Sequence, residues 1–227
     1  MNRPITTLFM LMSVDGKIST GATDVLDFDK DLPTIEYVRD GLQQYYDIER
    51  TTDLWSLCSG RTQAKIGANE RTDIQPAVDV SFAIIDNSHM RESGLKYFCA
   101  KAKKVVIITS NPNHPAYGVV DEKLNIIYQP KSDMLTALRQ LHQEYGCEKI
   151  TIQTGGTLNG LFLRQKLIDY VDVVVAPILV GGKEVSTLID GESIMSTSEL
   201  WRLGALRIED CTRLNDSYIR LRYKVMS

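Results

Sequence analysis

The sequence has few of the residues that build metal centres or disulfide frameworks. Its 227 residues include four cysteines and three histidines, and no two cysteines form a C-x-x-C pair. A zinc knuckle, a thioredoxin-type motif and a histidine-rich metal site are therefore not expected, and we predict no metal. Scattered cysteines without such pairs are typical of free buried thiols in a reducing compartment, which predicts a cytoplasmic protein.

The chain also lacks long apolar runs and an excess of positive charge. The apolar stretch 5–14 is too short for a membrane helix, is interrupted by Thr6, Thr7 and Ser13, and has no signal-peptide cleavage pattern. The formal net charge of −3 argues against a general nucleic-acid surface and leaves open only a local basic patch. We expect neither a membrane nor a nucleic acid among the partners.

What the chain does contain is an alternation of strand-like and helix-like segments. The length suits one large α/β domain, and the composition, 43% hydrophobic and 24% charged, is that of an ordinary globular protein. Alternating strands and helices predict a mainly parallel sheet, to which the C-terminal pair adds an antiparallel hairpin. The expected strands are 5–12, 53–58, 80–85, 105–108, 125–128, 150–153 and 171–176. The expected helices are 33–46, 62–66, 132–146 and 158–165. The hairpin joins residues 207–213 to residues 218–224.

The strongest local signal is a pair of glycines between a buried strand and a helix. A helix N-terminus offers free N–H groups and a partial positive charge, and glycines let a ligand approach the backbone, so the segment predicts a phosphate site. The spacing matches neither the Rossmann nor the Walker pattern, and the simpler alternative is a tight turn without a ligand. The residues concerned are Gly155, Gly156, Thr157, Leu158, Asn159 and Gly160.

Two further polar segments follow predicted strands. Gly60, Arg61 and Thr62 come after the strand at 53–58, where Arg61 suits a phosphate, although a solvated arginine beside a helix cap is the simpler interpretation. Asn87 and Ser88 follow the strand at 80–85 and are suited either to a ribose or phosphate or to an ordinary turn. Strand ends at one edge of an open sheet form the usual ligand crevice.

The turn after the first strand contains Asp15, Gly16 and Lys17. Either charged side chain is in a position to reach a substrate, and the simpler alternative is a turn with two solvated charges. A second glycine pair, Gly181 and Gly182, follows another buried strand and is typical of a mobile loop at the same sheet edge. Together, the segments predict a crevice for a long, phosphate-bearing cofactor.

The order of these motifs resembles the reductase domain of the bifunctional riboflavin-biosynthesis deaminase–reductase, the RibD C-terminal domain family. The likeness runs from the first strand to at least Gly191 and implies one dihydrofolate-reductase-like domain over residues 1–227, with a three-layer α/β/α architecture, and a homodimer. The matching segments are 13–17, 59–62, 84–88, 155–160, 167–172 and 176–182.

The resemblance implies NADPH as the cofactor, lying across the strand ends. The diphosphate would bind at the segment that begins with Gly155, and Met12 would line the nicotinamide or substrate pocket. Gly60, Arg61 and Thr62 would lie near cofactor phosphates, and Asn87 and Ser88 near the adenosine half. Arg61, Arg91 and Lys96 are the candidates for the 2′-phosphate.

The resemblance further implies hydride transfer from NADPH to a CH–OH or C=N type centre, here C1′ of a ribosylaminopyrimidine phosphate. The cofactor supplies the difficult chemistry and the protein positions it. The catalytic candidates are Asp15, which we favour as the proton donor, and Lys17, with an ordered water as the alternative. No segment of this sequence carries the zinc signature of the family's deaminase domain.

Several departures from the family pattern fall on the substrate side. Phe9 stands where these reductases carry a lysine, Gln153 stands in place of an acid, and Ile66 and Gly67 replace an acidic pair. Phe9 and Gln153 are accordingly the expected substrate-binding positions. Two alternatives stay open, namely an NADPH-dependent reductase of another pterin, folate or carbonyl substrate and a non-catalytic nucleotide-binding protein. A folate reductase needs a carboxylate from the first helix, where Glu36 and Asp40 lie without a recognisable motif.

Overall fold

The structure is a computed structural model that describes residues 2–73, 76–131 and 133–226. The chain divides into two compact units. Unit 1 comprises Met1–Ile5 and Asp53–Thr154, and unit 2 comprises Thr6–Thr52 and Gly155–Ser227. Within the described ranges, no helix is both long and apolar enough to cross a membrane.

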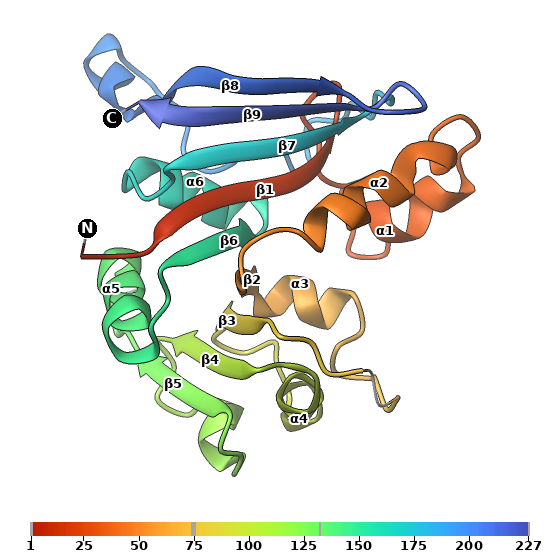
Figure 1. Cartoon of the computed structure of the whole chain (residues 1–227). Coiled ribbons are helices and arrows are strands. Elements are labelled where there is room, and N and C mark those ends of the chain that lie inside the picture. Colours follow the sequence, from red (N-terminus) through yellow and green to blue (C-terminus); the bar gives the residue numbers. More distant parts are fainter. Residues whose placement is uncertain (1, 74–75, 132, 227) are drawn as a thin grey trace. The chain divides into compact units, whose positions relative to one another are not determined.

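Unit 1 is built on five parallel strands in the order β5-β4-β3-β2-β6 (Figure 1). Parallel strands need crossover connections, and helices between them supply these. The strands are β2 (Trp55–Ser59), β3 (Ser81–Ile85), β4 (Lys104–Thr109), β5 (Leu124–Tyr128) and β6 (Lys149–Gln153). The helices are α3 (Gly60–Lys65), α4 (Glu92–Lys101), the 3-10 turn η2 (Pro115–Gly118) and α5 (Met134–Tyr145).

Both faces of the unit 1 sheet are covered. On one face, Val105 and Ile107 of β4 pack in a cluster with Phe98 of α4. Successive strand residues point to opposite faces, so Val106 and Ile108, which are equally buried, must be covered on the other side. Figure 1 shows α4 and α5 on opposite sides of these strands. Strands buried on both faces explain why this part of the sequence reads as nearly continuous apolar runs.

Unit 2 combines two parallel strands with an antiparallel hairpin, in the order β1-β7-β9-β8. Its strands are β1 (Ile5–Ser13), β7 (Tyr170–Ala176), β8 (Ala205–Arg213) and β9 (Ile219–Met226). Its helices are α1 (Phe28–Asp31), α2 (Arg39–Glu49), α6 (Gly156–Arg164) and the 3-10 turns η1 (Leu32–Thr34) and η3 (Thr197–Arg202). Phe9 and Val174 of the strands form one core cluster with Leu42 and Tyr45 of α2.

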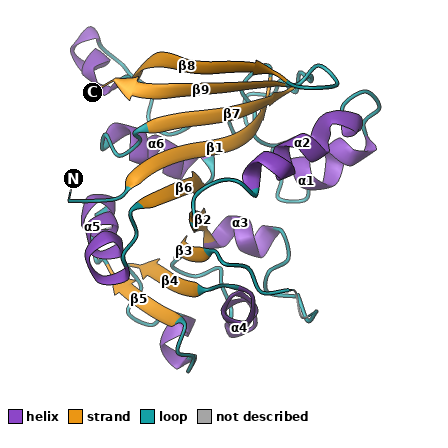
Figure 2. Cartoon of the chain, viewed as in Figure 1, coloured by secondary structure: helices purple, strands orange, loops and turns teal. Residues whose placement is uncertain are grey.

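The predicted fold class is confirmed, since the pairs along the sheet are parallel until the C-terminal antiparallel hairpin (Figure 2). The helix predicted at 33–46 is wrong at its start. Tyr37 has a φ of 65°, in the left-handed region, and α2 begins only at Arg39. Helix α4 was not predicted. Ser132, the predicted start of α5, lies outside the described residues, and Asp133 caps that helix by accepting a hydrogen bond from the Thr136 amide.

Candidate functional site

Three loops of unit 1 meet at the carboxylate of Asp86. Asp86 directly follows β3 and is 3% exposed. The loop after β4 brings His114 to it, and the segment after β2 brings Gly60, the first residue of α3. A Cβ on Gly60 would lie 2.4 Å from the Asp86 carboxyl, so only glycine fits there. The ends of three neighbouring parallel strands are thus joined through one buried acid.

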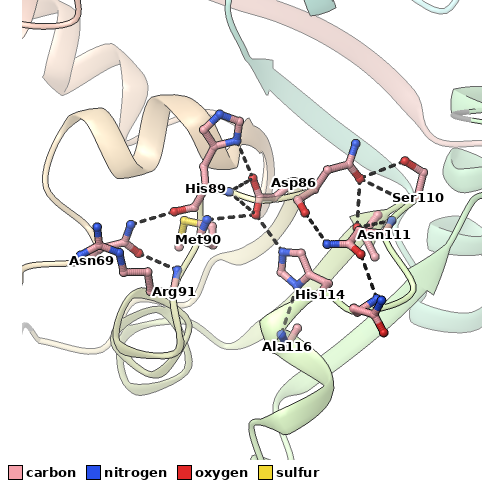
Figure 3. A network of polar contacts seen from close by, with 12 residues as sticks. Asn69, Asp86, His89, Met90, Arg91, Ser110, Asn111, His114 and Ala116 are labelled. Carbon is pink, nitrogen blue, oxygen red and sulfur yellow. Dashed lines mark hydrogen bonds and ion pairs between the residues drawn. The ribbon is translucent and has the colours of Figure 1, made fainter.

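The Asp86 carboxylate is saturated with hydrogen bonds (Figure 3). The backbone N–H groups of His89 and Met90 donate to it at 3.1 and 3.0 Å, His114 Nε2 donates at 2.8 Å, and His89 Nδ1 lies 3.1 Å away. Burial raises the pKa of this carboxyl, but the hydrogen bonds from His114, Met90 and His89 outweigh burial and lower the pKa to about 2. Asp86 is therefore an anion over the whole neutral range.

The ring of His114 has one arrangement of protons that satisfies both of its neighbours. Its Nδ1 accepts a hydrogen bond from the backbone N–H of Ala116 at 3.1 Å, so the ring proton is on Nε2, which donates to Asp86. His114 is 2% exposed. The pair links β3 to the start of η2 and fixes both segments relative to each other.

Asn87 and Ser88, both expected near the adenosine half of the cofactor, are exposed. The Asn87 side-chain oxygen accepts hydrogen bonds from the Ser110 N–H at 2.8 Å and from the Thr109 hydroxyl at 3.0 Å. Its backbone oxygen accepts from Asn111 Nδ2 at 2.7 Å. Asn87 therefore ties the loop after β3 to the loop after β4, and the hydroxyl of Ser88 is left on the surface beside it.

The segment after β2 presents its two polar side chains differently. Arg61 is exposed, whereas Thr62 is partly buried inside the short helix α3. Ser59, at the N-cap position, makes no side-chain capping bond. Since Gly60 and Asp86 are in contact, this segment and the loop that carries Asn87 belong to one rigid edge of unit 1.

In unit 2, Asp15 acts as an anchor for a loop. Its carboxylate accepts hydrogen bonds from the Ser13 hydroxyl at 2.6 Å and from the backbone N–H groups of Val180 and Gly181 at 3.1 and 2.6 Å. These bonds, the one from Ser13 first, lower the pKa of Asp15 to about 2. A carboxyl that is ionised at neutral pH has no proton to donate, so its contacts favour a role in holding the loop.

Lys17 holds the same loop from its other side. Its ammonium group donates to the backbone oxygens of Gly182 at 2.7 Å and Val185 at 2.9 Å. The backbone N–H of Lys17 donates to the Ser13 hydroxyl oxygen, so the turn and the loop form one hydrogen-bonded unit. The glycine pair predicted to make this loop mobile is therefore clamped at both ends.

The glycines at the start of α6 serve a close approach within the chain. A Cβ on Gly156 would lie 2.3 Å from both Thr187 O and the Asp190 carboxylate, and a Cβ on Gly160 would lie 2.1 Å from Asp190 O. Asn159, fully buried, donates from Nδ2 to Leu188 O at 2.9 Å. The loop 187–190 thus packs directly on the first turns of α6.

Other residues of the same motif remain open to a ligand. A Cβ on Gly155 would meet nothing within 4 Å, Thr157 is exposed and Leu158 is partly exposed. Gly155 is the N-cap of α6 and no side chain caps the helix, so the first-turn N–H groups are not satisfied by a cap. The predicted phosphate motif therefore divides into residues that hold a loop and residues that fit a phosphate.

The expected substrate-side residues have different environments. Phe9 is 0% exposed and stacks on Tyr45 with ring centroids 5.2 Å apart, so it is a core residue of unit 2. Gln153 is partly exposed, and its side-chain oxygen accepts a hydrogen bond from the Ser56 hydroxyl at 3.2 Å. Met12 is partly exposed at the end of β1. Gly67 has a φ of 88° and lies just after α3, with open space around it.

The remaining candidate charges lie on the surface. Arg91 Nη1 is 3.5 Å from a Glu70 carboxylate oxygen, and Lys96 Nζ is 3.5 Å from a Glu92 carboxylate oxygen. Asp40, in the first turn of α2, lies beside Arg39. Glu36 is exposed. Neither the Glu36 carboxylate nor the Asp40 carboxylate is buried, as an acid that binds a folate would be.

Within each unit, then, the structure brings some predicted residues together. Unit 1 joins Gly60 to the loop of Asn87, and unit 2 joins the turn of Asp15 to the loop at Gly181. Sequence reasoning missed His89 and His114, which are 3 and 28 residues from Asp86. No sequence motif links His114 to Asp86, because the two residues are 28 positions apart.

Comparison with protein families gives a match over nearly the whole chain. The model of the RibD C-terminal domain matches residues 4–215. A protein of Methanothermobacter thermautotrophicus named 2,5-diamino-6-ribosylamino-4(3H)-pyrimidinone 5′-phosphate reductase is 24% identical over 207 residues, which cover 88% of this chain and 90% of that protein. A protein of the same name from Archaeoglobus fulgidus is 29% identical over 84 residues, 37% of this chain and 35% of that protein.

Solved structures show the same fold. RibD of Acinetobacter baumannii matches all of this chain with a TM-score of 0.68 at 17% identity, and the chain spans 59% of its length. The riboflavin biosynthesis reductase Rib7 of Saccharomyces cerevisiae matches all of this chain with a TM-score of 0.63 at 11% identity, and the match covers 91% of that protein. The predicted resemblance to the reductases of riboflavin biosynthesis is confirmed, and the chain belongs to the RibD C-terminal domain family.

Proposed function

We propose that this chain is an NADPH-dependent oxidoreductase that reduces a ribosylaminopyrimidine 5′-phosphate. The observation that carries the proposal is the likeness to the Methanothermobacter reductase, which extends over 88% of this chain and 90% of that protein. The family match includes segments of both units, because it runs from residue 4 to residue 215. This continuity supports a single reductase domain over residues 1–227.

The start of α6 supports a dinucleotide cofactor. It combines an uncapped helix N-terminus with open space at Gly155, which suits a diphosphate. Gly155, Thr157 and Leu158 would hold that group. When bound, the nicotinamide ring supplies the hydride.

The residues of the chain then have to orient the substrate. We assign Asp15 and Lys17 to positioning, because both are committed to the backbone of the loop 180–185. The proton that completes the reduction would come from water. We keep Met12 and Gln153 as contacts of the nicotinamide ring and the substrate, because both retain exposed surface, and we assign Phe9 to the core.

Purified protein tests the proposal in two steps. A ligand that binds only the native state raises its stability by RT ln(1 + [L]/Kd), about 2.7 kcal/mol at a hundredfold excess over Kd, so thermal unfolding should shift upward with NADPH and less with NADH. The ribosylaminopyrimidine phosphate should then cause the absorbance of NADPH to fall. The absence of any shift with either nucleotide would contradict the cofactor assignment.

A second candidate is a nucleotide-binding protein without catalysis. The commitment of the ionised Asp15 to the loop and the burial of Phe9 favour it, because neither side chain is then able to donate a proton to a substrate. It predicts NADPH binding with no oxidation of NADPH by pyrimidine, pterin, folate or carbonyl substrates. Oxidation with a pterin or carbonyl substrate alone would instead identify a reductase of different specificity.

The hairpin supports a homodimer. Every residue of β8 is exposed, and Leu206 and Ile208 are 47% and 51% exposed, with Trp201 of the preceding turn at 65%. Exposed apolar residues on an edge strand mark an interaction surface. Light scattering should give twice the mass of one chain, and Leu206→Lys should give the monomer.

All four cysteines are free thiols, which supports a reducing, cytoplasmic location.

A further inference from the structure

Asn159 joins two parts of unit 2 that are far apart in the sequence. It lies in the first turn of α6, and its backbone N–H donates to Gly155 O, at the N-cap, at 3.0 Å. Its side chain binds a different segment, since Nδ2 donates to Leu188 O at 2.9 Å. Asn159 is 0% exposed, so it has no surface to offer a ligand. One buried residue therefore closes the first turn of the helix and holds the loop 187–190.

The loop 187–190 also binds the turn after β1. The backbone N–H of Leu188 donates to Gly16 O at 3.0 Å, so Leu188 binds α6 through its oxygen and the turn through its nitrogen. Beside it, the backbone N–H of Ile18 donates to Ser186 O at 3.0 Å. The first turn of α6 and the turn after β1 are thus connected by two hydrogen bonds in series, with one residue of the loop between them.

The loop is attached to the start of α6 at a second point. The backbone N–H of Asp190 donates to Gly156 O at 2.9 Å, and the Thr187 hydroxyl closes the loop by donating to the Asp190 carboxylate at 2.6 Å. Gly156 and Gly160 have no side chain to keep the loop away from the helix. The first turn of α6 therefore cannot unwind without breaking hydrogen bonds to this loop.

The start of α6 has two states, a formed first turn and a frayed one. Helices fray at their ends, and no side-chain cap opposes fraying here. A ligand that binds the N–H groups of the first turn binds only the formed state, so it suppresses fraying by the factor 1 + [L]/Kd. Because Asn159 bonds to both the turn and the loop, this suppression extends to the loop and to Gly16. The coupling is reciprocal, as thermodynamic linkage requires.

We propose that Asn159 is a positioning residue that couples ligand binding at the start of α6 to the order of the turn after β1. This proposal rests on the proposed function, which assigns the cofactor diphosphate to α6 and the nicotinamide ring to Met12, next to that turn. In this assignment Asn159 touches neither cofactor nor substrate and acts through the backbone of Leu188. The consequence is that bound cofactor makes the substrate bind more tightly, and bound substrate does the same for the cofactor.

Hydrogen exchange at the amides of Ile18 and Leu188 tests the coupling. In the unaltered chain, NADPH at a hundredfold excess over its Kd should slow exchange at both amides at least about tenfold, within the limit of about a hundredfold that linkage sets. In N159A the slowing should fall below about threefold, while the Kd of NADPH changes by less than about threefold. A loss of stability alone would speed exchange without ligand but would not remove the response to ligand.

Kinetics give a second measurement that a purely structural role would not change. In N159A the KM of the ribosylaminopyrimidine phosphate should rise about fivefold or more, the usual size of a coupling between two sites, although the affinity for NADPH is nearly retained. A variant that is only less stable would keep its KM, because the folded fraction would be unaltered at the site.

Two further variants complete the test. T187V removes the hydroxyl that closes the loop, at a partly exposed position, and should weaken the response to NADPH even if N159A does not fold. Asn125 of β5 is the matched control, since its Nδ2 also donates to a backbone oxygen, Lys123 O at 3.2 Å, so N125A should keep the full response. Circular dichroism checks that each variant is folded.

The inference is overturned if folded N159A, or folded T187V where N159A does not fold, responds to NADPH as strongly as the unaltered chain, or if N125A loses as much of the response. It is also overturned if neither NADPH nor inorganic pyrophosphate, a bare diphosphate measured in parallel, slows exchange at Ile18 and Leu188 in the unaltered chain. Failure of the proposed function looks different. In that case NADPH does not bind, while pyrophosphate still slows exchange at these amides in the unaltered chain and not in N159A.

Discussion

The two nitrogens of His114 have separable roles, and a pair of substitutions distinguishes them. In His114→Asn, the side-chain oxygen can replace Nδ1 and accept from the Ala116 N–H, but nothing replaces the donor to Asp86. In His114→Gln, the longer amide can reach Asp86, but the bond from Ala116 is lost. Hydrogen bonds to charged groups contribute about 1.5–3 kcal/mol and neutral ones about 0.5–1.5 kcal/mol, so H114N should be the less stable variant.

The pKa of Asp86 gives an independent magnitude. It falls from the ordinary 3.8 to about 2. At about 1.4 kcal/mol for each tenfold change, this corresponds to about 2 kcal/mol of stability, which is what the donors contribute after the opposing effect of burial is subtracted. Because the folded pKa is the lower one, that stability is fully present above the unfolded pKa and is lost as the pH falls through the folded pKa. About half should remain at pH 3.

Urea unfolding followed by circular dichroism at pH 7 and pH 3 measures these effects. We expect H114N to lose more stability than H114Q at pH 7, and the difference between H114N and the unaltered chain to shrink at pH 3. Equal losses in H114N and H114Q, or a difference that does not change with pH, would refute the view that the Asp86 bond is the stronger of the two.

Three other substitutions test the packing and ion pairs of unit 2. Gly160→Ala should lower the melting temperature although alanine favours helices by about 1 kcal/mol, because its Cβ meets Asp190 O, whereas Gly155→Ala should be neutral. Arg220 binds the nearly buried Asp172 through Nε and Nη2 at 2.9 and 2.6 Å, so R220M should cost about 3 kcal/mol in urea unfolding; a loss below 1 kcal/mol would contradict this. Asp15→Asn should speed hydrogen exchange at the backbone amides of Val180 and Gly181, which the carboxylate binds, at any pH above 4 and with no change at other amides. Unchanged exchange at these two amides would show that Asp15 does not hold the loop.

Sequence reasoning found the strands because most of them are buried on both faces. Strands such as β4 and β7 are nearly continuous apolar runs bounded by polar turns, which is a strong local signal. Helix α4 was missed although Leu95, Phe98 and Cys99, which it buries, recur at helical spacing in the sequence. The start of α2 depends on a distant contact, since Tyr218 donates its hydroxyl to Val38 O and packs its ring on Gly41.

The candidate site was predictable only in part, because some of its contacts join residues that are far apart in the sequence. Glycines at strand ends are visible in the sequence, but whether they make room for a ligand or for the chain itself is not. Gly156 and Gly160 make room for the loop 187–190, some 30 residues away, and only Gly155 is left open. The turn at Asp15 looked like two solvated charges or a proton donor, because the loop amides that hold it come from more than 160 residues further along.

The division of the chain has a consequence for its synthesis. All five strands of unit 1 are contained in one continuous segment, Asp53–Thr154, so its sheet can form as soon as that segment leaves the ribosome. The edge of β1 that pairs with β7 must wait for that strand, since Thr7 pairs with Tyr170. At about 5–20 residues per second, the delay is roughly 10–30 seconds. During that time this edge of an apolar strand is open in the nascent chain, and we expect chaperones to bind there.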